Sequence, residues 1–134
     1  MVEVRARRRE GFTHDVEIDG EARLVIDEPR ESGGADKGPS PTRTLAGALA
    51  ACTAITVEMY ADRKGWEVGP LEVRVEMEYG EAGVPRTFLV TLHLPKELSN
   101  DQVDRVREIA GKCPVHRALR HEQELTIEDR VELV

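Results

Sequence analysis

One stretch of this chain, residues 38–66, constrains its fold more than any other. Ser40 and Pro41 favour the start of a helix there, and Gly65 favours its end. Between them, apolar residues spaced by three and four positions share one helix face: Leu45, Ala48, Cys52, Ile55 and Met59. The pattern therefore predicts a single long helix over about 41–64.

The other faces of this helix are also nearly apolar between Leu45 and Val57. A helix of this kind is normally covered on most of its sides. A chain of 134 residues can surround such a helix only with difficulty. We therefore expect a second subunit to cover part of it.

Length and charge narrow the class of protein. The length fits a single domain over residues 1–134. A net charge of −7 argues against nucleic-acid or anionic-membrane binding, because both need a basic face. The N-terminus is charged where a signal peptide needs apolar residues, and the apolar run Leu45–Val57 is too short to span a bilayer. We therefore expect a cytoplasmic protein that does not enter a membrane and whose cysteines are free.

The first part of the chain alternates apolar and charged residues. This alternation predicts N-terminal strands over about 2–27, with a hairpin turn at Asp19-Gly20. The next segment, about 28–40, has no periodicity and is rich in glycine and proline. We expect it to be either a functional loop covering the start of the long helix or a plain surface connection.

The second half of the chain predicts a β-hairpin over about 70–94. Ser99 and Gln102 have the spacing of a capping box, and helices are expected within about 100–120. Alternating apolar residues then predict a final strand over about 124–133. This order of elements indicates an α+β fold, in which antiparallel sheets pack against helices.

The two cysteines are the residues best suited to carry chemistry. Cys52 lies in the middle of the apolar helix, where a cysteine is ordinarily a small core residue and needs a nearby cation to ionise. Cys113 precedes Pro114, the expected start of a short helix, so free N–H groups should favour its thiolate. A metal site at Cys113, His116 and His121 is a competing hypothesis, but it lacks a fourth ligand. We expect neither a metal nor another cofactor.

Three segments follow one another in a distinctive order and spacing: PRESGGADKGPSPT (29–42), LAGALAACTAITVEMYADRKGW (45–66) and KCPVHRAL (112–119). In these segments the sequence resembles the OsmC/Ohr superfamily of thiol-dependent peroxide-reducing proteins, and its OsmC-like branch most. With the strands between them, the likeness covers nearly the whole chain. It implies an OsmC-like fold, with antiparallel sheets wrapped around long central helices in an intertwined homodimer.

The resemblance also implies a role for each residue of the site. Cys52 would be the peroxidatic thiol, which attacks a hydroperoxide and becomes a sulfenic acid. Cys113 would resolve that acid to a disulfide, which an external dithiol reductant then reduces. The arginine that ionises the first thiol aligns best with Arg9. The alternatives are Arg7, Arg8, Arg30 and Arg43.

The sequence departs from the family pattern at the start of the long helix. Family members carry a glutamate after Ser-Pro that orients the arginine, whereas this chain reads Ser40, Pro41, Thr42, Arg43. The main hypothesis is a thiol peroxidase that acts in oxidative-stress defence. Its substrates would be organic hydroperoxides, with hydrogen peroxide as a further candidate. The departure keeps a second hypothesis open, a non-catalytic OsmC-like protein that binds a small apolar ligand at the dimer interface.

Overall fold

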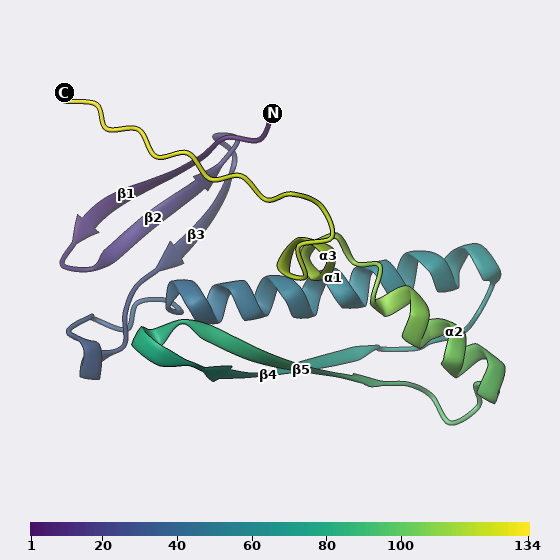
Figure 1. Cartoon of the computed structure of the whole chain (residues 1–134). Coiled ribbons are helices and arrows are strands. Elements are labelled where there is room, and N and C mark those ends of the chain that lie inside the picture. Colours follow the sequence, from purple (N-terminus) through teal and green to yellow (C-terminus); the bar gives the residue numbers. More distant parts are fainter. The chain divides into compact units, whose positions relative to one another are not determined.

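The structure is a computed structural model that describes all 134 residues (Figure 1). The first elements in chain order are β1 (Val4–Glu10), β2 (Thr13–Ile18), β3 (Ala22–Ile26), the 3-10 helix η1 (Arg30–Ser32) and α1 (Pro41–Lys64). They are followed by β4 (Glu72–Tyr79), the 3-10 helix η2 (Glu81–Gly83), β5 (Pro85–His93), α2 (Asn100–Ala110) and α3 (Pro114–Leu119). The expected α+β class is confirmed.

The chain divides into two compact units. One unit holds residues 1–47 and 77–88, and the other holds residues 48–76 and 89–134. The long helix α1 therefore begins in the first unit and continues through the second. The same is true of the β4–β5 hairpin, whose tip belongs to the first unit.

The first unit contains an antiparallel sheet with the strand order β1-β2-β3. Val16 pairs with Ala6 on one side and with Leu24 on the other, so apolar residues line up across one face. The turn between β2 and β3 has positive φ at both central residues, 51° at Asp19 and 75° at Gly20. Positive φ at both positions is typical of the two-residue hairpin turn that the sequence predicts.

A buried carboxylate organises the loop between β3 and α1. Asp27 is only 2% exposed, and its oxygens accept hydrogen bonds from the Thr13 hydroxyl at 2.7 Å and from the Glu28 backbone N–H at 2.7 Å. The N–H groups of Ala35 and Lys37, at 3.4 and 3.2 Å, also donate to it. The Thr13 hydroxyl contributes most to lowering the pKa of Asp27 to about 2, and these N–H groups add to the effect.

Two glycines let this loop fold tightly over its own backbone. A Cβ atom at Gly34 would lie 1.9 Å from the Glu28 carbonyl oxygen, and one at Gly38 would lie 2.1 Å from that of Val25. Both distances are too short for any side chain, so the loop needs glycine at these two positions. The segment expected at 28–40 is therefore an ordered loop rather than a loose connection.

The long helix has the predicted bounds, and the side chain of Ser40 accepts a hydrogen bond from the N–H of Arg43 at 3.4 Å. Its buried residues follow one another every fourth position: Leu49, Thr53, Val57 and Ala61. The stripe singled out in the sequence is instead largely uncovered, because Ile55 is 50% and Met59 63% exposed. Within one chain the helix therefore buries a different face from the expected stripe.

The core of the second unit forms where α2 packs on α1 and the hairpin. Val57 of α1 packs with Val106, Ile109 and Ala110 of α2. Five partly buried side chains close around this cluster: Tyr60, Trp66, Leu71, Leu92 and Leu94. The predicted capping box is present at the start of α2, where Ser99 and Gln102 bond each other's backbone N–H groups at 3.1 and 2.8 Å.

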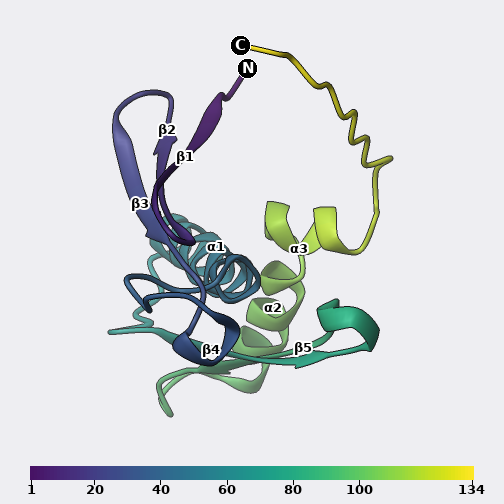
Figure 2. The same cartoon turned by 90° about the vertical axis from the view of Figure 1, so that its left-hand side faces the viewer.

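The strand expected over about 124–133 is not formed. Residues after α3 run without helix or strand to the end of the chain, as the yellow segment in Figure 2 shows. A strand needs a neighbouring edge to satisfy its backbone, and this segment pairs with none. Its apolar residues stay exposed as a result, with Leu125 at 55% and Ile127 at 78%.

By length and composition alone, α1 could also cross a membrane. Its most apolar window has a mean hydropathy of 1.3 and is 22% buried. The sequence-based expectation rested on the shorter run Leu45–Val57, whereas the helix continues well beyond it. A central helix of a water-soluble protein has the same composition, so this property does not separate the two cases.

Candidate functional site

Both cysteines belong to the second unit, and both are free thiols. Cys52 lies near the middle of α1 and is half-buried, at the border between the buried face and the exposed stripe. Cys113 is the residue before α3, where its sulfur accepts a hydrogen bond from the N–H of His116 at 3.4 Å. Its side chain is completely buried.

The two thiols lie beside each other. The pKa of Cys113 is raised, first because burial disfavours its thiolate and then because of a hydrogen bond and the charge of Cys52. The His116 N–H and the Thr53 hydroxyl lower the same pKa by smaller amounts. The expected short helix is present, but burial outweighs its N–H groups, so the expectation of a favoured Cys113 thiolate is wrong.

Thr53 is a residue of this site that sequence reasoning missed. It is completely buried next to Cys52, and its hydroxyl donates to the Leu49 carbonyl at 2.8 Å. Its only signal in the sequence is a polar residue within the apolar run of the helix. Thr53 is spaced four residues from both Leu49 and Val57. This spacing becomes informative only when the structure shows which face of α1 is buried.

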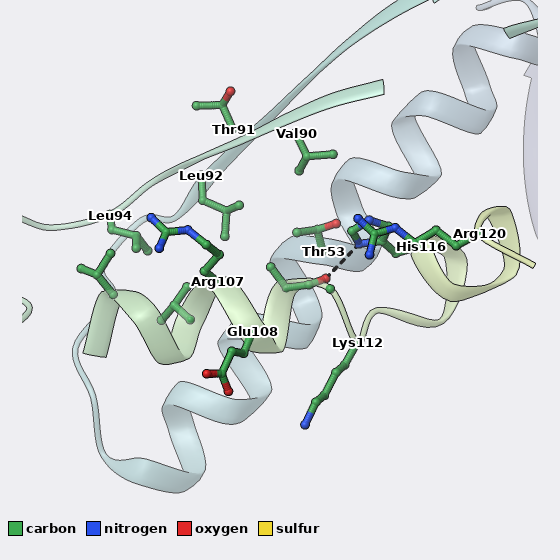
Figure 3. A pocket seen from close by; sticks show the side chains of 14 residues that line it. Thr53, Val90, Thr91, Leu92, Leu94, Arg107, Glu108, Lys112, His116 and Arg120 are labelled. Atoms are coloured by element: carbon green, nitrogen blue, oxygen red, sulfur yellow. Dashed lines mark hydrogen bonds between the residues drawn. The ribbon is translucent and has the colours of Figure 1, made fainter. Parts of the chain in front are cut away.

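A cavity of about 640 Å³ opens within the second unit, and its lining includes Thr53 and Lys112, which are the sequence neighbours of the two cysteines (Figure 3). Its apolar wall comes from β5 and α2: Val90, Leu92, Leu94, Val103 and Val106. Its polar lining includes Thr53 and His116 at one end and four charged side chains elsewhere: Arg107, Glu108, Lys112 and Arg120. The cavity is therefore suited to a mainly apolar molecule, with a positive balance of charge around it.

The arginine expected to activate Cys52 lies in the first unit. Arg9 is on β1, where its Nε donates to a carboxylate oxygen of Asp15 at 3.1 Å, and this bond raises its pKa. The alternative Arg43 lies in the first turn of α1 and is also in the first unit. Cys52 and Cys113 thus belong to one unit, and both of these arginines belong to the other.

The competing metal site does not come together. No group of three or more His, Cys, Asp or Glu side chains is placed to hold a metal ion. The ring of His116 instead approaches the Ala110 carbonyl, with its Nδ1 at 3.3 Å from the oxygen. His121 is exposed in the segment after α3. The hypothesis that these two histidines and Cys113 share a metal is therefore not supported by the geometry.

Two neighbouring thiols, one half-exposed and one buried, can cycle between a dithiol and a disulfide. The accessible thiol can be oxidised by a reagent from solution, and the buried thiol can then attack the oxidised sulfur. The neutral form favoured at Cys113 slows that second step unless a group nearby accepts the proton. The arrangement is suited to reduction of a peroxide by two thiols.

Known proteins resemble this chain in sequence and in fold. The family model described as OsmC-like protein matches residues 34–128. An OsmC-like protein from Mycoplasma pneumoniae is 19% identical, with a TM-score of 0.76 over 90% of this chain and 87% of that one. An organic hydroperoxide resistance protein from Legionella pneumophila is 21% identical, with a TM-score of 0.61 over 90% and 89% of the two chains.

A third solved structure is the organic hydroperoxide resistance protein OhrB of Bacillus subtilis. It is 25% identical to this chain, with a TM-score of 0.58 over 90% of each chain. No curated protein matches the sequence. The solved structures therefore support the fold over nearly the full length of the chain.

Proposed function

The chain belongs to the OsmC-like family, and we propose that it is a thiol peroxidase that reduces organic hydroperoxides without a cofactor. One observation carries this proposal: the only two cysteines of the chain lie beside each other in one unit, next to a cavity with an apolar wall. Relatives named as organic hydroperoxide resistance proteins share the fold. The names of these relatives support organic hydroperoxides as the proposed substrate class.

In the proposed reaction the Cys52 thiolate attacks one oxygen of the hydroperoxide. The O–O bond breaks, the alcohol leaves with a proton, and Cys52 becomes a sulfenic acid. The Cys113 sulfur then attacks the oxidised Cys52 sulfur, which forms a disulfide and releases water. An external dithiol donates two electrons and two protons to restore both thiols.

The apolar wall of the cavity favours organic over inorganic peroxides. A hydroperoxide with a hydrocarbon body buries that body against residues such as Leu92 and Val106, whereas hydrogen peroxide has nothing to bury. Arg9 is proposed to supply the positive charge that the Cys52 thiolate needs. Its pairing with Asp15 keeps its guanidinium in a defined orientation on β1.

We further propose that the protein works as a homodimer in the cytoplasm. Ile55 and Met59 leave an apolar stripe of α1 uncovered in the single chain, and a second copy would cover it. Two free thiols that must be reduced again after every turnover suit a reducing compartment. Burial of that stripe between two copies also accounts for a membrane-like helix in a water-soluble protein.

A single-turnover reaction with stoichiometric cumene hydroperoxide tests the proposed function. We expect rapid loss of two thiols per chain, with a mass decrease of about 2 Da from an intramolecular disulfide. Cys52→Ser should abolish the reaction, whereas Cys113→Ser should permit one turnover and stop at the sulfenic acid. Arg9→Gln should slow the first step, with Arg5→Gln as the matched control from the same strand.

Persistent thiols in the wild-type protein would contradict the proposal. That outcome would favour the second candidate, a non-catalytic protein that binds an apolar ligand. Two observations motivate this candidate, namely the size of the cavity and the absence of an acid at Thr42 and Arg43. It predicts a small molecule that copurifies with the protein and leaves on denaturation.

A further inference from the structure

The backbone N–H of His116 donates to the buried sulfur of Cys113, and the His116 ring lines the cavity. Resting on the proposed function, we propose that His116 is a catalytic proton carrier for the disulfide-forming step. It accepts the proton of the Cys113 thiol as the sulfur attacks Cys52, and it returns that proton to the departing hydroxide. The assignment rests on how one turn of the chain holds the thiol and the imidazole together.

One backbone carbonyl fixes both groups. The carbonyl oxygen of Ala110 accepts the N–H of Cys113 at 3.4 Å and lies 3.3 Å from Nδ1 of His116. The backbone N–H of His116 in turn donates to the Cys113 sulfur at 3.4 Å. The backbone of His116 is thus held against the Cys113 sulfur, and its ring is held against the same carbonyl that accepts the Cys113 N–H.

The same carbonyl selects the tautomer of the imidazole. A carbonyl oxygen only accepts, so the hydrogen of a neutral His116 ring belongs on Nδ1. Nε2 is then the proton acceptor, and it has no hydrogen-bond partner within the protein. Figure 3 shows the ring at the end of the cavity beside Thr53, with a dashed line to the Ala110 carbonyl. A proton from the cavity side can therefore reach Nε2.

The chemistry of the step requires such an acceptor. Cys113 is completely buried and favours its neutral form, and a neutral thiol is a poor nucleophile. The cations that line the cavity, Arg107, Lys112 and Arg120, have no free lone pair to offer. The remaining acid, Glu108, accepts a bond from Arg105 at 2.7 Å.

Histidine is the side chain that both accepts and donates a proton near neutral pH. In the proposed step the S–H bond of Cys113 breaks, and its proton moves to Nε2 of His116. The sulfur then forms a bond to the Cys52 sulfur as the S–O bond of the sulfenic acid breaks. The leaving oxygen takes the proton from His116 and departs as water, so the imidazole ends neutral.

A peroxide-free experiment tests this role independently of the proposed function. The wild-type protein is mixed with 2,2′-dithiodipyridine, which converts the accessible Cys52 to a mixed disulfide and releases one thiopyridone. Attack by Cys113 on that mixed disulfide then releases a second thiopyridone, and absorbance follows both releases. Cys113→Ser should release only the first.

We expect His116→Gln to slow the second release about 100-fold at pH 7 and to leave the first within about twofold of wild type. The loss should shrink at higher pH, where Cys113 ionises without a base. In His116→Gly, imidazole added to the buffer should restore part of the rate, which a purely structural role would not allow. Arg117→Gln is the matched control, because Arg117 is the next residue of α3, lies outside the cavity lining and pairs with Glu122 instead.

A second release that keeps its wild-type rate and pH profile in both His116 variants would overturn the proposal. The proposal would also be overturned if the second release were slow in His116→Gly and added imidazole did not restore its rate. An unchanged first release and an unchanged circular dichroism melt show that each variant is folded. Failure of the proposed function shows itself separately, as wild-type protein that reacts with the disulfide reagent but not with hydroperoxide.

Discussion

Asp27 and Cys113 are both almost fully buried, one in each unit, yet their surroundings favour opposite charge states. Asp27 accepts four hydrogen bonds, from one hydroxyl and three backbone N–H groups, and its pKa falls to about 2. Cys113 accepts one backbone N–H at 3.4 Å, and burial raises its pKa. Burial disfavours the charged form of both groups, and only Asp27 has enough donors to offset that cost.

The largest effect is expected when a carboxylate replaces Cys113, where few hydrogen-bond donors are present. Cys113→Asp should lower the free energy of unfolding by about 3 kcal/mol, because a carboxylate at this site has no set of N–H groups to replace water. Urea denaturation at pH 7 measures the change. Cys113→Ser is the matched control and should cost less than about 1 kcal/mol, since serine caps a helix as well as aspartate does but buries no charge. Equal stability of both variants would contradict the comparison.

An intermediate effect is expected at Asp27. Its pKa is about 2, below the ordinary 3.8, so the stability it contributes is present above pH 4 and is lost as the pH falls toward 2. Asp27→Asn should lower the Tm at pH 7 by on the order of 5 °C and should remove this loss in acid. Thermal melts between pH 7 and pH 2 measure both.

The exposed Asp36 of the same loop provides the control for this experiment. Its side chain forms no hydrogen bond, and asparagine tolerates its positive φ of 55°. Asp36→Asn should therefore keep the wild-type Tm and its acid dependence. If Asp27→Asn behaved in the same way, the loop would not depend on a charged Asp27.

The smallest effect is expected at Thr53. Its hydroxyl lowers the pKa of Cys113, so Thr53→Val should raise that pKa further. In a Cys52→Ser background, we expect the thiolate absorbance of Cys113 near 240 nm to develop at a higher pH in Thr53→Val than without that substitution. Thr44→Val is the control, because the Thr44 hydroxyl makes the same kind of bond, to the Ser40 carbonyl at 2.8 Å. If the pKa of Cys113 were the same in Thr53→Val as in the wild type, the Thr53 hydroxyl would have no influence on the thiol.

Local patterns predicted most of the fold. Ser40 and Gly65 marked the ends of α1, and Ser99 with Gln102 marked the start of α2, because caps act within one turn of their own helix. The final strand was predicted from its alternation alone and is not formed. Pairing depends on a partner edge elsewhere, which alternation within a segment does not report.

The sequence singled out the two cysteines but did not indicate their electrostatics. Cys52 and Cys113 stood out because they were the only cysteines, and they do lie together. The raised pKa of Cys113 could not be read from Pro114 and His116, since it depends on burial by segments far away in sequence. For the same reason, the sequence did not indicate that Asp27 would be buried at the centre of the loop between β3 and α1.

The exposed segment after α3 bears on how long a newly made chain persists in a cell. Its apolar residues are accessible, with Ile127 at 78% and Val131 at 87%, and its backbone is unpaired. Proteases cut such segments first, and chaperones retain chains that display them. A partner that bound residues 124–134 would therefore also protect the chain from degradation.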